Sequence, residues 1–108
     1  MEMNADYLRI GHRGARAYAP ENTLRSFARA LELGVNAIEF DVRQTKDGQL
    51  IVMHDDKVDR TTTGKGLVKD LSLKEIKELD AGDGERVPAF GEALDFIGGK
   101  VDRILIER

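Results

Sequence analysis

Polar side chains that could bind a metal ion, bind an anion or move a proton stand at the ends of short apolar segments of this sequence. Two of these segments lead into histidines, His12 and His54, and Arg13 directly follows the first. Three carboxylates complete the set, at the inward-facing positions of otherwise apolar segments: Glu39, Asp41 and Glu107. Two imidazoles, a guanidinium and three carboxylates together predict phosphoester cleavage assisted by a divalent cation.

The acidic residues indicate which kind of cation this would be. Three like charges are costly to bury together unless a cation neutralises them. The sequence contains no cysteine, so a hard cation, Ca²⁺ or Mg²⁺, is predicted rather than a soft metal. Arg13 beside that cation favours an anionic substrate, most naturally a phosphate. His12 and His54 could then divide the proton transfers, one accepting a proton from the nucleophile and the other donating one to the leaving oxygen.

Four predicted strands position these residues. In residues 37–42 apolar side chains alternate with a second set that includes Glu39 and Asp41, so both carboxylates lie on one face. The carboxyl ends of parallel strands converge at one edge of a sheet or at one mouth of a barrel, which would bring the polar residues together. The expected strands are residues 7–10, 37–42, 50–53 and 103–108.

Three helices are predicted between the strands. The first has apolar residues at helical spacing, begins after Asn22, which can cap it, and ends at Gly34. The second begins near Ser72 in a capping-box pattern and runs to about Leu79. Pro88 opens a third, short helix. Strands that alternate with helical segments indicate an α/β architecture with a mostly parallel sheet.

The connection over residues 43–49 leaves the direction of one strand open. A helical crossover usually takes a dozen or more residues, and this segment is shorter. Either it returns in an extended form, or Asp47 and Gly48 make a hairpin turn and the strands on either side run antiparallel.

The composition is that of one small domain. The chain has 108 residues, 41% of them hydrophobic, with 17 Lys and Arg against 20 Asp and Glu. The acidic excess argues against nucleic acid as a partner, no apolar run approaches the roughly 20 residues that span a bilayer, and the first residues lack a signal-peptide pattern. We expect a single cytoplasmic domain over residues 1–108, with a disordered leader at 1–6 and an irregular insertion at 57–70.

Several motifs follow one another through almost the whole chain. They are Gly11-His12-Arg13-Gly14, Pro20-Glu21-Asn22-Thr23, Glu39-Phe40-Asp41-Val42, Thr45-Lys46-Asp47-Gly48, His54-Asp55, Asp59-Arg60-Thr61-Thr62 and Gly64-Lys65-Gly66. In this order and spacing the sequence resembles the glycerophosphodiester phosphodiesterase family. The resemblance implies a TIM-type barrel that hydrolyses glycerophosphodiesters, its small-molecule substrates, to glycerol 3-phosphate and an alcohol with the help of a divalent cation.

The resemblance also implies roles for individual residues. His12 and His54 match the acid/base pair of the family, and Arg13 matches a phosphate contact. The metal ligands implied by the resemblance are Glu39, Asp41 and Glu107.

The sequence is short for the implied barrel. A complete (β/α)₈ barrel takes about 250 residues, and here the match ends at the expected fourth strand. We therefore expect half of a TIM-type barrel with four mostly parallel strands. A homodimer would complete it, with strand four of each chain beside strand one of the other. Hydrolysis by the half-barrel itself is expected to be weak or absent.

Other interpretations remain open. The chain could be an inert, self-associating half-barrel scaffold, or a phospholipase-type phosphodiesterase, although it shows no basic amphipathic helix for membrane docking. Gly64-Lys65 lacks the spacing of a nucleotide-binding loop. Asp55 is expected to cap local backbone amides rather than bind metal. Glu21 and Asn22 could contact substrate, but helix capping accounts for Asn22, which is expected to be structural.

Overall fold

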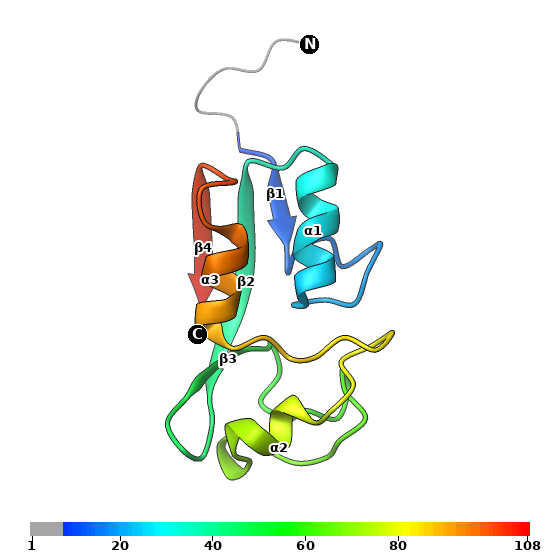
Figure 1. The fold of residues 1–108 in the computed structure, drawn as a ribbon, viewed down its shortest axis with the longest axis vertical. Coiled ribbons are helices and arrows are strands. Elements are labelled where there is room, and N and C mark those ends of the chain that lie inside the picture. Colours follow the sequence, from blue (N-terminus) through cyan, green and yellow to red (C-terminus); the bar gives the residue numbers. More distant parts are fainter. Residues whose placement is uncertain (1–7) are drawn as a thin grey trace.

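The computed structural model describes residues 8–108. The elements in this part are β1 (Ile10–His12), α1 (Leu24–Glu32), β2 (Ala37–Gln44), β3 (Leu50–Val52), the 3₁₀ helix η1 (Val68–Asp70), α2 (Leu73–Lys77), α3 (Phe90–Ile97) and β4 (Arg103–Glu107) (Figure 1). The leader expected at residues 1–6 and the expected strand start at Tyr7 lie outside the described residues.

The sheet is built around β2. Strand β1 pairs with β2 in parallel, and so does β4, so the α/β class with a mostly parallel sheet is confirmed. Figure 1 shows β1 and β4 running in the same direction, with the lobe formed by residues 45–88 beyond their carboxyl ends. The polar residues at those strand ends therefore lie between the sheet and this lobe.

Strand β3 settles the question that the sequence left open. It pairs with β2 in antiparallel register through a hairpin, in which the Thr45 amide donates to the Gln49 carbonyl at 2.8 Å and Gly48 adopts a φ of 81°. The positive φ favours glycine at this turn. The expected half-barrel of four strands is therefore wrong in one respect. β3 folds back on β2 as a hairpin, and β4 takes the place directly beside β2. Three strands, β1, β2 and β4, are parallel.

Helices α1 and α3 cover one face of the sheet. Phe40 of β2 packs between Phe27 of α1 and Phe90 of α3, with ring centroids 5.7 and 6.1 Å away. Phe27 and Phe40 are fully buried, and burying each such ring contributes roughly 1.5–3 kcal/mol. Because side chains alternate along β2, this core turns Glu39 and Asp41 to the opposite face.

The lobe over residues 45–88 has its own hydrophobic cluster. Its buried residues are Ile51, Met53, Val58, Val68, Ile76, Ala81 and Val87. Residues 57–67 contain no helix or paired strand, only an isolated bridge between Lys57 and Leu67, yet Val58 is fully buried. This packing fixes the segment that carries His54 above the strand ends.

Helix boundaries follow local capping. The N-cap of α1 is Thr23, whose side chain accepts a hydrogen bond from the Ser26 amide at 3.2 Å, so the expected capping role of Asn22 is wrong. Asn22 instead adopts a left-handed φ of 56°. The capping box at Ser72 is confirmed, and α2 ends at Lys77 rather than at Leu79. Helix α3 begins at Phe90, two residues after Pro88.

Candidate active site

The open face of the sheet collects polar residues from three strands. His12 of β1 lies opposite Glu39 of β2, and Asp41 of β2 lies opposite Glu107 of β4. Residues directly opposite each other in neighbouring strands project to the same face, with backbones about 4.8 Å apart. Pairing through β2 therefore places four of the six sequence-predicted site residues on one surface.

His12 and Glu39 form the first contact of the site. The imidazole Nδ1 lies 3.0 Å from Glu39 Oε1, and the Arg13 amide donates to the same oxygen at 3.0 Å. Glu39 is 7% exposed. Burial raises the pKa of the Glu39 carboxyl above its usual range, and the charges of Asp41 and Glu107 add to this effect. A cation nearby would stabilise the ionised form of Glu39 and lower this pKa.

Arg13 lies at the centre of the site. Its Nη1 donates to Glu21 Oε2 at 3.2 Å, and its Nε lies 3.6 Å from Asp41 Oδ2. The backbone is in the left-handed region, with φ 52°, and its carbonyl accepts hydrogen bonds from the Asn22 amide at 3.0 Å and from Ser26 Oγ at 2.9 Å. These bonds offset the cost of the unusual backbone conformation.

Asn22, for which the sequence favoured a structural role over substrate contact, lies in the candidate site. Its side chain is 4% exposed and its Nδ2 donates to Asp41 Oδ2 at 3.2 Å. Among residues 8–108, Asn22 Oδ1 is one of two buried side-chain polar atoms without a hydrogen-bond partner, and Arg13 Nε is the other. Asparagine tolerates the left-handed conformation better than most residues, and this was the signal available in the sequence.

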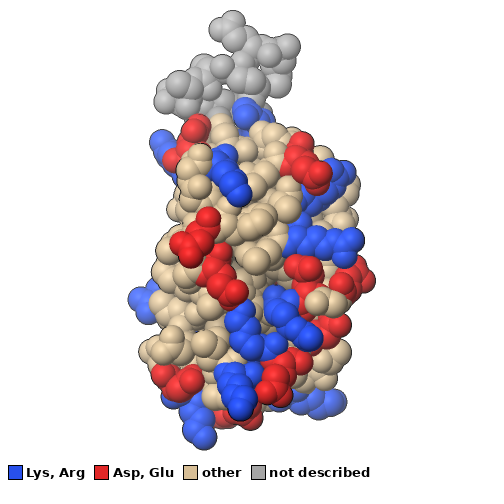
Figure 2. All heavy atoms as spheres, in the orientation of Figure 1, with Lys and Arg blue, Asp and Glu red and all other residues tan. Residues whose placement is uncertain are grey.

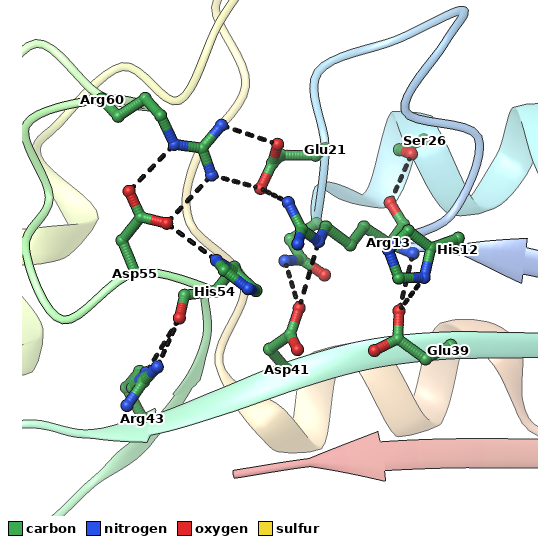
Figure 3. A network of polar contacts seen from close by, with 11 residues as sticks. His12, Arg13, Glu21, Ser26, Glu39, Asp41, Arg43, His54, Asp55 and Arg60 are labelled. Carbon is green, nitrogen blue, oxygen red and sulfur yellow. Dashed lines mark hydrogen bonds and ion pairs between the residues drawn. The ribbon is translucent and has the colours of Figure 1, made fainter.

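His54 belongs to a second cluster across the site (Figure 3). Its Nδ1 lies 2.8 Å from Asp55 Oδ1. Asp55 was expected to cap backbone amides; its carboxylate instead contacts His54 and the Arg60 guanidinium. Arg60 reaches on to Glu21. Nothing in the local sequence links Arg60 with Glu21, since 39 residues separate them, and only their places in the family motifs marked them.

The charges of this second cluster favour ionised carboxylates. Hydrogen bonds from Arg60 and His54 hold the pKa of Asp55 well below its usual range. Burial alone would raise the pKa of Glu21, but hydrogen bonds and positive charge from Arg60 and Arg13 outweigh it and lower the pKa. The same two carboxylates raise the pKa of Arg60. Glu21, Asp55 and Arg60 are therefore charged at neutral pH.

The three expected metal ligands share a face without converging. Within residues 8–108 no three His, Asp or Glu side chains lie close enough together to enclose a metal ion. Both contacts to Glu39 fall on Oε1, and both contacts to Asp41 fall on Oδ2, so each carboxylate keeps one oxygen for a ligand. With the unpartnered Asn22 Oδ1 nearby, this oxygen-rich donor set fits a hard cation such as Ca²⁺ or Mg²⁺.

Figure 2 shows charged side chains of both signs on one face of the molecule. On the face shown in Figure 2, Lys and Arg side chains are interspersed with Asp and Glu, and no broad patch of one sign forms. A polyanion would require a continuous basic stripe. No helix in the described part of the chain is long and apolar enough to cross a membrane.

Comparison with known proteins identifies relatives along nearly the whole chain. The family model described as "Glycerophosphoryl diester phosphodiesterase family" matches residues 12–104. The chain is 51% identical over 105 residues to a glycerophosphodiester phosphodiesterase of Caldanaerobacter subterraneus, which covers 91% of this chain and 43% of the relative. It is 45% identical over 106 residues to a glycerophosphodiester phosphodiesterase of Bacillus subtilis, covering 84% of this chain and 36% of the relative.

Solved structures agree with the sequence comparison. A glycerophosphodiester phosphodiesterase from Agrobacterium tumefaciens superposes with a TM-score of 0.85 at 40% identity, over 90% of this chain and 46% of the other. A phosphodiesterase from Oleispira antarctica, solved in complex with the product sn-glycerol-3-phosphate, gives 0.86 at 36% identity, over 93% and 45%. The chain thus spans less than half the length of these relatives.

Proposed function

This chain belongs to the glycerophosphoryl diester phosphodiesterase family, and from that premise we propose that it carries the catalytic groups for hydrolysis of glycerophosphodiesters to glycerol 3-phosphate and an alcohol. The observation that carries the proposal is the matching orientation of the two histidines. His12 and His54 each present Nδ1 to a carboxylate, Glu39 and Asp55 respectively. In both imidazoles this leaves Nε2 for proton transfer.

In the proposed reaction the two imidazoles exchange protons with the substrate. The Nε2 of the neutral imidazole accepts a proton from the attacking water as the water oxygen bonds to phosphorus. The other imidazole, protonated on both nitrogens, donates its Nε2 proton to the alcohol oxygen as the phosphorus–oxygen bond to that alcohol breaks, so one proton is taken up and one is released. In the view of Figure 3 the Arg13 guanidinium lies between His12 and His54, where it could bind the anionic phosphate oxygens by charge-assisted hydrogen bonds.

A divalent cation would complete the site. Glu39, Asp41 and Glu107 would bind it, and once bound it would neutralise phosphate charge and act as a Lewis acid. Supporting this assignment are the register that pairs Asp41 with Glu107 and the raised pKa of Glu39. The chemistry suits Ca²⁺ and Mg²⁺ alike.

Hydrolysis of glycerophosphocholine, followed by the release of glycerol 3-phosphate, tests the proposal. We expect the parent chain to turn over weakly, His12→Ala and Glu39→Ala to lose about 10²-fold or more of that rate, and the exposed control Glu32→Ala to match the parent. Undiminished turnover in His12→Ala would overturn the site assignment.

Two alternatives have their own outcomes in the same assay. A folded parent chain without any turnover would support the inert half-barrel scaffold. Faster cleavage of a micellar lysophospholipid than of glycerophosphocholine would support the phospholipase-type function. The homodimer and the cytoplasmic location inferred from the sequence stay predictions.

A further inference from the structure

Arg60 makes a denser set of contacts than any other arginine around the site. Its Nη1 and Nη2 donate to the two carboxylate oxygens of Glu21 at 3.0 and 2.9 Å. Its Nε and Nη2 donate to the two oxygens of Asp55 at 2.9 and 3.0 Å. One guanidinium thus donates two hydrogen bonds to each of two carboxylates, and this bidentate geometry is the strongest form of an arginine–carboxylate ion pair.

Each of these carboxylates also contacts a residue of the proposed reaction. Asp55 Oδ1 lies 2.8 Å from His54 Nδ1, and Glu21 Oε2 accepts from Arg13 at 3.2 Å. Figure 3 shows the resulting chain of contacts from His54 through Arg60 to Arg13. The segment that contains Arg60 is thereby linked to both the proton-transfer group and the phosphate contact.

Ordinary surface ion pairing does not account for this arrangement. Two exposed arginines of α1 each make a single ion pair. Arg25 Nη1 lies 3.8 Å from Asp83 Oδ2, and Arg29 Nη1 lies 3.7 Å from Glu32 Oε1. Such pairs contribute little to stability. The Glu21 side chain, by contrast, is only 12% exposed. A nearly buried carboxylate shared by two guanidinium groups restricts both of them.

We propose that Arg60 is a positioning residue of the catalytic site: through Asp55 it fixes His54 in the Nδ1–H tautomer, and through Glu21 it orients Arg13. The catalytic purpose of this positioning rests on the proposed function, whereas the contacts of Arg60 do not depend on it. An ionised carboxylate can only accept hydrogen bonds, so Asp55 held by Arg60 requires a proton on Nδ1 of neutral His54 and leaves Nε2 unprotonated.

The backbone of His54 is secured independently of Arg60. Arg43 donates to the His54 carbonyl from Nε at 3.1 Å and from Nη2 at 2.6 Å. Removing the Arg60 side chain should therefore release the Asp55 carboxylate and the His54 ring while the peptide stays in place. A change confined to the ring is the signature that separates positioning from folding.

The test is the ¹⁵N NMR spectrum of the two imidazoles, since the chain has only two histidines. At a pH where both rings are neutral, we expect His54 of the parent chain to show a protonated Nδ1 and an unprotonated Nε2. In Arg60→Ala the His54 signals should move towards a mixture with Nε2–H, whereas His12 should not change. The matched control, Arg25→Ala, should leave both rings unchanged.

A conservative variant and a binding measurement complete the test. Arg60→Lys retains charge but not the paired geometry, so it should shift His54 only in part, and it replaces Arg60→Ala if that variant fails to fold. Affinity for sn-glycerol 3-phosphate should fall by about tenfold in Arg60→Ala and stay unchanged in Arg25→Ala.

An unaltered His54 tautomer in folded Arg60→Ala or Arg60→Lys would overturn the positioning role. A parent chain that neither binds glycerol 3-phosphate nor turns over glycerophosphocholine would count against the proposed function instead. The tautomer result decides the role of Arg60 in either case.

Discussion

Each imidazole of the site has its own carboxylate partner, but the two carboxylates differ in charge balance. Asp55 is surrounded by cations, and its pKa is lowered first of all by the Arg60 hydrogen bonds. Glu39 is buried beside further acids, and its pKa is raised. His54 is therefore paired with a carboxylate that stays ionised under most conditions. The ionisation of Glu39, the partner of His12, depends instead on whether positive charge is present nearby.

Replacing Glu39 should change how stability depends on metal ions and on pH while leaving the fold intact. Its folded-state pKa lies above the usual value, so ionised Glu39 costs stability at neutral pH, and this cost disappears as pH falls through the raised pKa. We expect Glu39→Gln, whose amide oxygen can still accept from His12 and Arg13, to raise the melting temperature in EDTA and to flatten its dependence on pH.

The same variant should lose the response to cations. For the parent chain, Ca²⁺ or Mg²⁺ at 100 times its dissociation constant should stabilise by about 2.7 kcal/mol, measured by thermal unfolding. Glu32→Gln, on the exposed face of α1, is the control and should behave as the parent. An identical cation response in Glu39→Gln would contradict the metal assignment.

Among the elements, the loop between β1 and α1 determines where Arg13 and Asn22 meet. Ser26, in the first turn of α1, bonds to both ends of the turn that follows Arg13: its Oγ donates to the Arg13 carbonyl at 2.9 Å and accepts from the Ala15 amide at 2.7 Å. The helix thereby fixes the strand end that carries the site. Gly14 lies inside this turn with a φ of 81°.

Two glycines with similar backbone angles test the importance of that close approach. An added Cβ at Gly14 would lie 2.8 Å from Ser26 Cβ, whereas at Gly34, φ 83°, it would meet no atom within 4 Å. Gly34→Ala should cost only the left-handed conformation, about 1–2 kcal/mol. Gly14→Ala should cost roughly 2–5 kcal/mol, because overpacking adds to that strain.

Urea unfolding of the two variants measures the difference. Equal losses in Gly14→Ala and Gly34→Ala would show that the Ser26 contact yields without cost. A larger loss in Gly14→Ala, accompanied by weaker glycerol 3-phosphate binding, would confirm that the turn supports Arg13.

On the scale of the whole molecule, the parallel sheet is open on two sides. β1 and β4 each pair only with β2 among the described strands, and Ile10 and Ile106 on these outer strands are 48% and 44% exposed. Exposed apolar edges favour association with another strand. Two copies would supply six parallel strands, so the eight parallel strands of a TIM barrel cannot come from a simple pair.

Association of the chain should be measurable all the same. We expect light scattering at micromolar concentration to give a mass above that of a monomer, and Ile10→Lys or Ile106→Lys to lower it, because charged edge residues oppose strand pairing. Lys74→Gln, at an exposed position of α2 in the lobe over residues 45–88, should not. A stable monomeric parent chain would refute the predicted homodimer.

Features encoded over a few residues followed from the sequence alone. The alternation in residues 37–42 placed Glu39 and Asp41 on one face, the capping box located α2, and Asp47-Gly48 allowed the hairpin that the structure contains. The family motifs named His12, Arg13 and His54. Each of these signals depends on local backbone geometry or on residues that are neighbours in sequence, so no knowledge of distant contacts was needed.

Contacts between distant segments were decided only by the tertiary structure. The pairing of β4 with β2, the hydrogen bond from Asn22 to Asp41, and the bridge from Arg60 to Glu21 each depend on how the chain returns upon itself. The helix and strand propensities of the individual segments do not distinguish among these tertiary arrangements. The packing of two hydrophobic clusters, one on the sheet and one in the lobe beyond it, selects among them and thereby brings His12 and His54 into one network of polar contacts (Figure 3).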